Sequence, residues 1–388
     1  MQRIGLLIGC VFSILAQADA LNINTADTLV IDGYENSRFW DVVCSANEKS
    51  VCYMVVSATR LVADAEQQDV LLYELNQDGH IDKVASLSYP QKISRVKVTR
   101  SNSAVVAQLN GSQGNVGLVL FDTRHGRATN ITDYISRFGD QGQFIAASME
   151  RDHEAVMLYG HNHKLELISV DVLAGKKARQ QSLLLPADEH VSILDFSAVA
   201  GGYLVVGAGQ EQGRRYGVAM MALDSGASED HYRLVNNYYY AVEARGRHLL
   251  AFGNSIVKDD SVVTVFEGSG PGYKHKGDFQ FSKAGGLNID NGVMCDKYVY
   301  EISADSSNKF TRMHIIFHGI SQASAANPQT TPATIIVNAN TPILFQSARI
   351  FSINQQAFLL LNAGELNSSS RQLETRIIMT KVIGIADC

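Results

Sequence analysis

The 388-residue sequence predicts an all-β fold, a closed ring of seven four-stranded antiparallel sheets. Short runs rich in Val, Leu and Tyr alternate with clusters of Gly, Asn, Asp and Ser, as strands alternate with turns. No long segment keeps the 3.6-residue period of an amphipathic helix. One apolar run returns along the chain at intervals of roughly fifty residues, which is the spacing of a repeat architecture.

The recurring run is expected to be a central strand of each sheet. Its copies are residues 51–56, 104–107, 155–158, 203–206, 248–251, 298–301 and 357–360. A ring of such sheets buries each sheet against its two neighbours and leaves only short edges exposed. The main rival, two β-sandwich domains, does not account for the regular spacing.

A second marker follows most copies of the central strand: another strand, an acidic residue, and a glycine a few positions later. The instances are Glu74 with Gly79, Asp122 with Gly126, Asp171 with Gly175, Asp224 with Gly226, and Glu267 with Gly270. The acid can cap a turn through its side chain, and the glycine supplies a positive φ. The last two units lack this marker.

This hairpin resembles the one common in four-stranded β-propeller blades, notably quinoprotein-like blades. The resemblance covers five of the seven units and implies a seven-bladed β-propeller without indicating a particular family. The Trp-Asp dipeptides of WD repeats are absent, and the chain has only 1 Trp. The segment Thr28–Ile31 precedes the first full unit, and we expect it to close the ring as the outer strand of the last blade.

The N-terminus predicts export. Arg3 precedes an apolar run over Ile4–Leu15, and small residues at signal-peptidase spacing follow it. We therefore expect a secretory signal peptide over residues 1–20, cleaved after Ala20 or else after Ala18, and a single propeller domain over residues 21–388. An uncleaved N-terminal anchor is the alternative. No later segment is long and apolar enough to span a membrane, so we expect an extracytoplasmic protein, periplasmic or secreted.

Four cysteines follow the predicted signal peptide, and an even number in an oxidising compartment predicts two disulfides. Three pairings are open. We favour Cys44–Cys52, which flanks a turn within one hairpin, and Cys295–Cys388, which would join the last blade to its neighbour. The alternative is that one or both pairs stay reduced.

Composition and motifs exclude several classes of function. The net charge of −6 and the absence of any run of Lys and Arg argue against nucleic-acid binding. The chain contains no Gly-x-Ser-x-Gly elbow and no His-Glu-x-x-His, and Gly207 to Gly213 does not have dinucleotide-binding spacing. We therefore predict neither cofactor nor metal. The partial calcium-loop pattern over Glu74–Asp82 falls where other units have an ordinary turn.

Ligands of propellers usually sit at the face where the chain enters the innermost strands, over the central channel, and this fold-level analogy gives a location only. Polar and aromatic residues precede or begin those strands, and such a set suits protein or carbohydrate recognition. The candidate ligand-binding residues are Arg38, Trp40, Arg95, Tyr238, Tyr239, Asn288, Asp290 and Arg349. For the two tyrosines the alternative is ordinary packing within the strand.

Two functions remain open. The first is a monomeric, non-catalytic module that binds or scaffolds a protein or glycan, favoured because catalytic motifs are absent. The second is a propeller hydrolase or lyase that acts on a sugar or lactone with residues drawn from scattered strands. Convergent ionisable groups with shifted pKa values over one channel would indicate the enzyme, whereas a broad, mildly apolar patch would indicate the binder.

Overall fold

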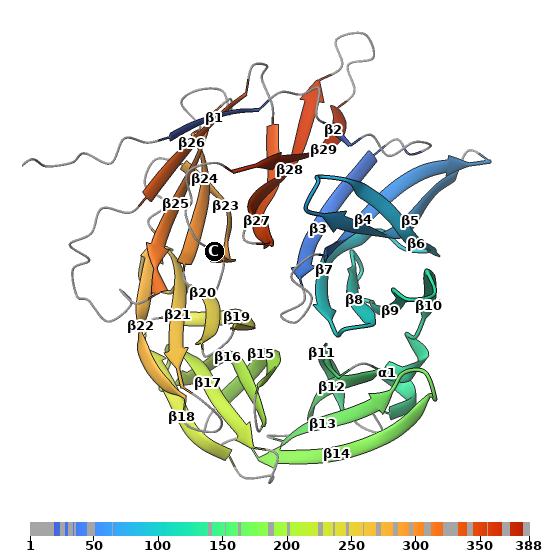
Figure 1. Cartoon of the computed structure of the whole chain (residues 1–388). Helices are drawn as coiled ribbons and strands as arrows, with labels where there is room; N and C mark the ends of the chain where they lie inside the picture. Colours follow the sequence, from blue (N-terminus) through green and yellow to red (C-terminus); the bar gives the residue numbers. More distant parts are fainter. Residues whose placement is uncertain are drawn as a thin grey trace, which may run out of the picture.

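A computed structural model of the chain shows strands arranged in a ring (Figure 1). The structure describes residues 19–23, 28–29, 34, 36–44, 51–63, 65–138, 142–151, 153–161, 164–184, 190–199, 202–223, 228–235, 237–245, 248–258, 260–268, 273–281, 286–294, 298–305, 312–320, 333–339, 344–354, 356–366 and 373–382.

The strands of the N-terminal half form three antiparallel sheets of four. The first sheet consists of β3 (Asn36–Cys44), β4 (Val51–Val62), β5 (Ala65–Asn76) and β6 (Ile81–Tyr89). The second consists of β7 (Ile93–Arg100), β8 (Ala104–Gly111), β9 (Val116–Asp122) and β10 (Arg127–Asn130). The third consists of β11 (Gln143–Arg151), β12 (Glu154–His161), β13 (Lys164–Asp171) and β14 (Lys176–Leu184).

The remaining strands continue the same arrangement. Next come β15 (His190–Val199), β16 (Gly202–Glu211), β17 (Arg214–Leu223) and β18 (Ser228–Val235), then β19 (Asn237–Arg245), β20 (His248–Ser255), β21 (Ser261–Glu267) and β22 (Lys274–Phe281). The β23 (Gly286–Met294), β24 (Tyr298–Asp305), β25 (Arg312–Gly319) and β26 (Ala333–Ala339) strands carry an added strand, β1 (Asp19–Ile23). The last sheet contains β2 (Thr28–Leu29), β27 (Leu344–Ile353), β28 (Gln356–Leu366) and β29 (Leu373–Lys381).

The number of four-stranded blades is six, not the seven expected from the repeats. The β23–β26 sheet has five strands, because β1 is added to it. The outer strand β26 pairs in parallel with β1, from Asp19 opposite Ile335 to Ile23 opposite Ala339. An outer strand has an unpaired edge that another segment can cover by backbone hydrogen bonding. The predicted cleavage after Ala20 falls inside β1, whereas cleavage after Ala18 would retain the whole strand.

A short N-terminal strand also reaches the last sheet. Thr28 and Leu29 form β2, which pairs antiparallel with Ile378 and Ile377 of β29. The other two residues of the predicted closing segment, Val30 and Ile31, lie outside the described residues.

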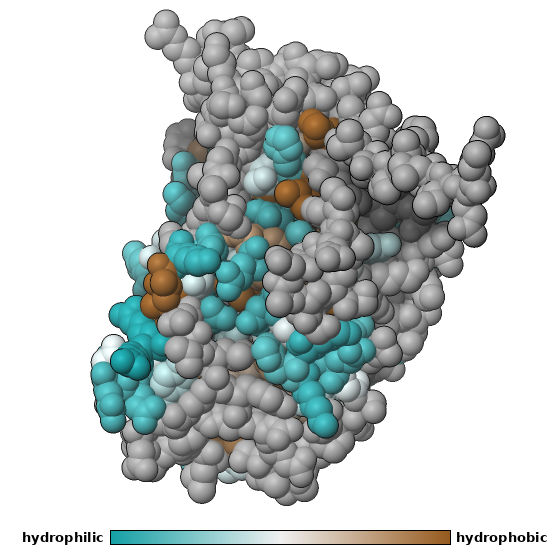
Figure 2. All heavy atoms as spheres, turned by 90° about the vertical axis from the view of Figure 1, so that its left-hand side faces the viewer, coloured by the Kyte–Doolittle hydropathy of each residue, from teal (hydrophilic) through white to brown (hydrophobic). Residues whose placement is uncertain are grey.

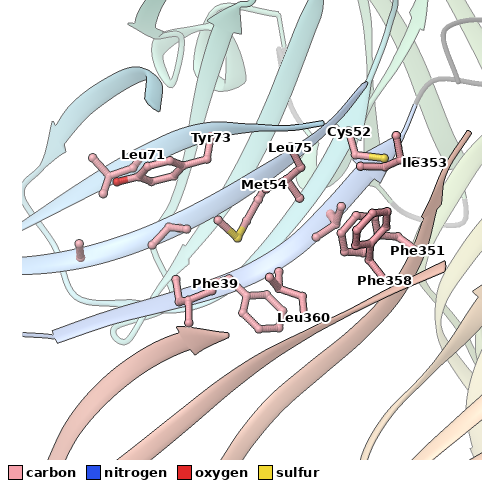
Figure 3. Packing of buried hydrophobic residues seen from close by; sticks show 14 residues of the cluster. Phe39, Cys52, Met54, Leu71, Tyr73, Leu75, Phe351, Ile353, Phe358 and Leu360 are labelled. Atoms are coloured by element: carbon pink, nitrogen blue, oxygen red, sulfur yellow. The ribbon is translucent and has the colours of Figure 1, made fainter. Parts of the chain in front are cut away.

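Hydrophobic side chains fill each space between consecutive sheets, so the core is a set of separate interfaces around the ring. The interface between the first and last sheets is shown in Figure 3, where Phe39 and Met54 lie beside Phe351, Phe358 and Leu360. Residues of β3–β5 and β27–β29 thus pack together although they are separated by most of the sequence.

The second strand of each sheet corresponds to the recurring apolar run, from β4 through β28. These strands are almost fully buried, because neighbouring sheets cover both of their faces. The turn marker is confirmed at Gly126 and Gly175, which have φ +62, and at Gly79, which has φ +85. Asp122 and Asp171 accept backbone N–H groups of their turns, whereas at the first turn Asn76, not Glu74, does so.

The innermost strands, β3, β7, β11, β15, β19, β23 and β27, surround the centre of the ring in Figure 1. Their free edges donate backbone N–H groups to side chains of the preceding sheet. Ala147 donates to Gln108 Oε1 at 3.0 Å, and Val242 donates to Asp195 Oδ2 at 3.0 Å. These bonds satisfy edge groups that would otherwise be buried without a partner.

One of the two predicted disulfides is confirmed: Cys44 and Cys52 face each other across the β3–β4 pair and are bonded. Cys295 and Cys388 lie outside the described residues.

The side of the ring formed by β22 and β25 is mostly hydrophilic where its residues are coloured, and hydrophobic residues are scattered singly (Figure 2). The described part of the chain contains one α-helix, the short α1 (Asp133–Phe138), and no helix there could cross a membrane.

Candidate functional site

Every innermost strand is interrupted by a bulge at the same point of the strand, and β11 has a second irregularity between Met149 and Arg151. In each case two residues that pair with consecutive positions of the second strand are separated by one unpaired residue. The unpaired residues, here called the bulge ring, are Trp40, Ser94, Ile145, Leu194, Tyr240, Ile289 and Gln346. Bulges re-aim side chains and recur next to binding sites.

At two of the bulges the backbone of the innermost strand comes so close to the second strand that only a glycine fits there. A Cβ atom on Gly207 would overlap the carbonyl oxygen of Ser192, and one on Gly253 would overlap that of Tyr238. The Gly207–Gly209 segment, which does not have dinucleotide-binding spacing, therefore serves the bulge and the close contact with the Tyr216 ring.

The bulges lie near the face of the ring where the innermost strands begin, which we call the start face. In an antiparallel sheet, the turn between the second and third strands lies at this same end. Of the six exposed large hydrophobic residues described, five belong to the start face, namely Leu61, Val62, Leu194, Ile256 and Val257, and Leu173 lies in a turn at the opposite end. Apolar exposure is thus concentrated at one face.

Trp40 of the bulge ring is held by two contacts with residues of its own sheet. Its indole Nε1 donates to Ser57 Oγ at 2.8 Å, and the guanidinium carbon of Arg38 lies 4.1 Å from its ring centroid. Partial burial lowers the pKa of Arg38, because removal from water disfavours its charged form. The guanidinium is thereby held over the indole face in a cation–π contact.

Two ion pairs join residues near the bulges of different sheets. Arg349 Nε lies 3.2 Å from Asp41 Oδ1 and so links the last sheet to the first. Lys97 of β7 donates hydrogen bonds to the Asp195 carboxylate of β15 and to the carbonyl oxygen of Phe196. Its side chain therefore reaches across β11, which lies between these two strands in the ring. The β11 residues at the matching positions are small, Ala146 and Ser148, which leaves room for the lysine.

The structure brings most of the predicted ligand residues to the bulges. Asn288 and Asp290 flank the bulge of β23, and Arg95 follows that of β7. Tyr238 lies at the start of β19, and its hydroxyl accepts a hydrogen bond from Asn254. Tyr239 is fully buried, and its hydroxyl is 2.7 Å from Thr264 Oγ1, so its side chain packs within the sheets.

Sequence reasoning missed Leu194, Lys97 and Asp195. Leu194 is 44% exposed between buried neighbours, and an unpaired apolar residue inside a strand has no local signature. The available signal was the pair of glycines opposite the bulges, which recur after the apolar run in two consecutive units.

One carboxyl group near the start face has an unusual environment. Burial, with a smaller contribution from the nearby Asp260 carboxylate, raises the pKa of Glu301 to about 7. Glu301 is paired with Asn291, just beyond the bulge of β23. The described residues contain no group of three or more His, Cys, Asp or Glu side chains placed to hold a metal ion.

Neither the known family models nor the curated proteins include a match. The β-propeller domain of the Trilobed protease from Pyrococcus furiosus is similar over 91% of this chain and 98% of its own, with a TM-score of 0.52 and 9% identity. The WD40 domain of SCAP from fission yeast covers 90% of this chain and 96% of its own, with a TM-score of 0.48 and 8% identity. At this identity the first likeness shows the fold alone, a β-propeller.

Proposed function

We propose that this protein is an exported, non-catalytic β-propeller that binds a protein or glycan ligand on its start face. The observation that carries the proposal is the concentration of exposed apolar side chains at that face, around the regularly placed bulge ring. Preorganised apolar positions beside a few polar groups favour recognition of a ligand.

The charges around the bulges support binding over catalysis. Lys97 pairs with Asp195 and Arg349 pairs with Asp41, and such pairs hold the sheets in place. The Cys44–Cys52 disulfide supports export, because disulfides persist in oxidising compartments.

Trp40 provides the test, because it is the chain's 1 Trp and belongs to the bulge ring. A panel of peptides and oligosaccharides is titrated against the purified protein while Trp40 emission is followed. We expect a saturable change with one ligand class. Leu194→Ser should weaken that binding about tenfold, because it removes a central apolar contact.

Leu173→Ser is the matched control, since Leu173 is 57% exposed at the opposite end of the ring. It should leave the titration unchanged. Equal losses in the two variants, or turnover of a sugar or lactone by the purified protein, would contradict the proposed function.

A further inference from the structure

Three cations occupy the start of two neighbouring innermost strands. Arg38 and Lys92 are at matching positions, each two residues before a bulge residue, Trp40 in β3 and Ser94 in β7. Arg95 directly follows Ser94. All three are exposed, and β3 and β7 are in contact.

This basic sector contrasts with the ion pairs next to it. Asp41, the nearest carboxylate on β3, is engaged by Arg349 and by the backbone N–H of Val42. The Arg38 guanidinium rests on the Trp40 ring rather than on an acid. A guanidinium fixed in this way is ready to form paired hydrogen bonds with a carboxylate.

The rest of the start face has a different character. Leu194, Ile256 and Val257 expose aliphatic side chains there. One face of the Trp40 indole is covered by Arg38, and the indole also packs against the apolar interface between the first two sheets. A sugar ring would need an open aromatic face, whereas a peptide can supply apolar side chains.

The geometry points to an acidic polypeptide segment as the ligand of the start face, with its carboxylates on Arg38, Lys92 and Arg95 and its apolar side chains on the Leu194 side. This inference rests on the proposed function and names the ligand class of the same site. The chain has an overall charge of −6, so this basic sector is a local feature. Its positive charge would steer an acidic ligand to the start face.

Titration calorimetry with a short peptide that alternates glutamate and leucine tests the inference. We expect this peptide to bind, with an affinity that falls as salt is added. Arg38→Gln and Arg95→Gln should each weaken binding about tenfold, which is the usual effect of losing one charge-assisted hydrogen bond. Arg127→Gln removes the charge of another exposed arginine, on the outer strand β10, and should have no effect.

The other outcomes separate this inference from the proposed function. Equal affinity for a peptide of alternating glutamine and leucine would overturn the acidic ligand and leave peptide binding standing. Tighter binding of oligogalacturonate than of the acidic peptide would overturn the polypeptide class. Equal weakening in Arg127→Gln would remove the assignment to this sector.

Discussion

At the residue scale, Glu301 departs from the pattern of the other second strands. Glu301 pairs with the second residue after the bulge of its innermost strand. The residue that pairs with the same position in the other six sheets is apolar and buried: Met54, Leu109, Met157, Val205, Ala251 or Leu361. In β24 it is Glu301, 8% exposed. Carboxylates are rarely buried without a compensating partner, because the charged form loses its hydration.

Glu301→Gln should change how stability depends on pH. A raised pKa of about 7 means that the folded state holds the proton more tightly than the unfolded state does. The resulting stabilisation is complete at low pH and is lost as pH rises from the ordinary glutamate value through 7. We expect the variant to match the parent at pH ~5 and to exceed its unfolding free energy by on the order of 2 kcal/mol at pH ~8.

Denaturant unfolding at the two pH values measures this difference. Glu66→Gln is the control, because Glu66 is exposed on β5 and should change nothing at either pH. A constant difference between Glu301→Gln and the parent at both pH values would show that Glu301 is not protonated near neutrality.

Gly207→Ala should destabilise the protein because the added Cβ would overlap the Ser192 carbonyl at the bulge. Relief of that overlap requires a backbone shift, which costs about 2–3 kcal/mol. Gly213→Asn is the comparison: Gly213 has φ +80 with open space around it, and asparagine tolerates that conformation. Thermal unfolding should therefore separate the two variants, and similar melting temperatures would argue against a tight bulge.

At the element scale, the second strands were predictable and the bulges were not. A second strand is covered on both faces, so it appears in the sequence as a continuous apolar run. A bulge adds one residue to an edge strand, and that residue can be Trp40 as readily as Ser94. Strand β1 was missed because its pairing with β26 is distant in sequence and its residues overlap the predicted signal peptide.

The candidate ligand residues divide in the same way. The start face was predicted from the chain's route into the inner strands, and it gathers Arg38, Trp40 and Arg95. For the two tyrosines, the alternation of side chains between the two faces of the strand decides the orientation. Tyr239 is directed into the core, while the Tyr238 hydroxyl lies near Asn254. Sequence position alone cannot separate such neighbours once a bulge shifts the alternation.

The β3–β4 hairpin should lose stability when its disulfide is removed. Cys44 and Cys52 are separated by 8 positions, and the crosslink restricts a short loop in the unfolded chain. We expect the Cys44→Ser, Cys52→Ser double variant to lose about 2 kcal/mol. Unfolding of the parent with and without a reductant provides the check, and an unchanged midpoint would show that the bond adds little.

At the scale of the whole molecule, the ring depends on packing between its first and last sheets. Phe39 and Met54 contact the side chains of β27 and β28 across that interface. We propose that β2 strengthens this junction, because it adds backbone pairing to the buried Ile377 and Ile378 of β29.

Truncation separates the contributions of the two N-terminal strands. A chain that starts at residue 24 lacks β1 and keeps β2, and a chain that starts at residue 30 lacks both. The shorter chain should be less stable than the longer one by about 1 kcal/mol, since the backbone pairing of Thr28 and Leu29 with β29 is lost. Equal unfolding midpoints for the two chains would remove β2 from the closure.

The measurement that tests the central claim most directly is a crystal structure of the protein with the alternating glutamate–leucine peptide. The account predicts peptide density on the start face, with carboxylates against Arg38 and Arg95 and a leucine side chain against Leu194. Ordered peptide on an outer strand edge, such as β14 or β18, with a bare start face would contradict it.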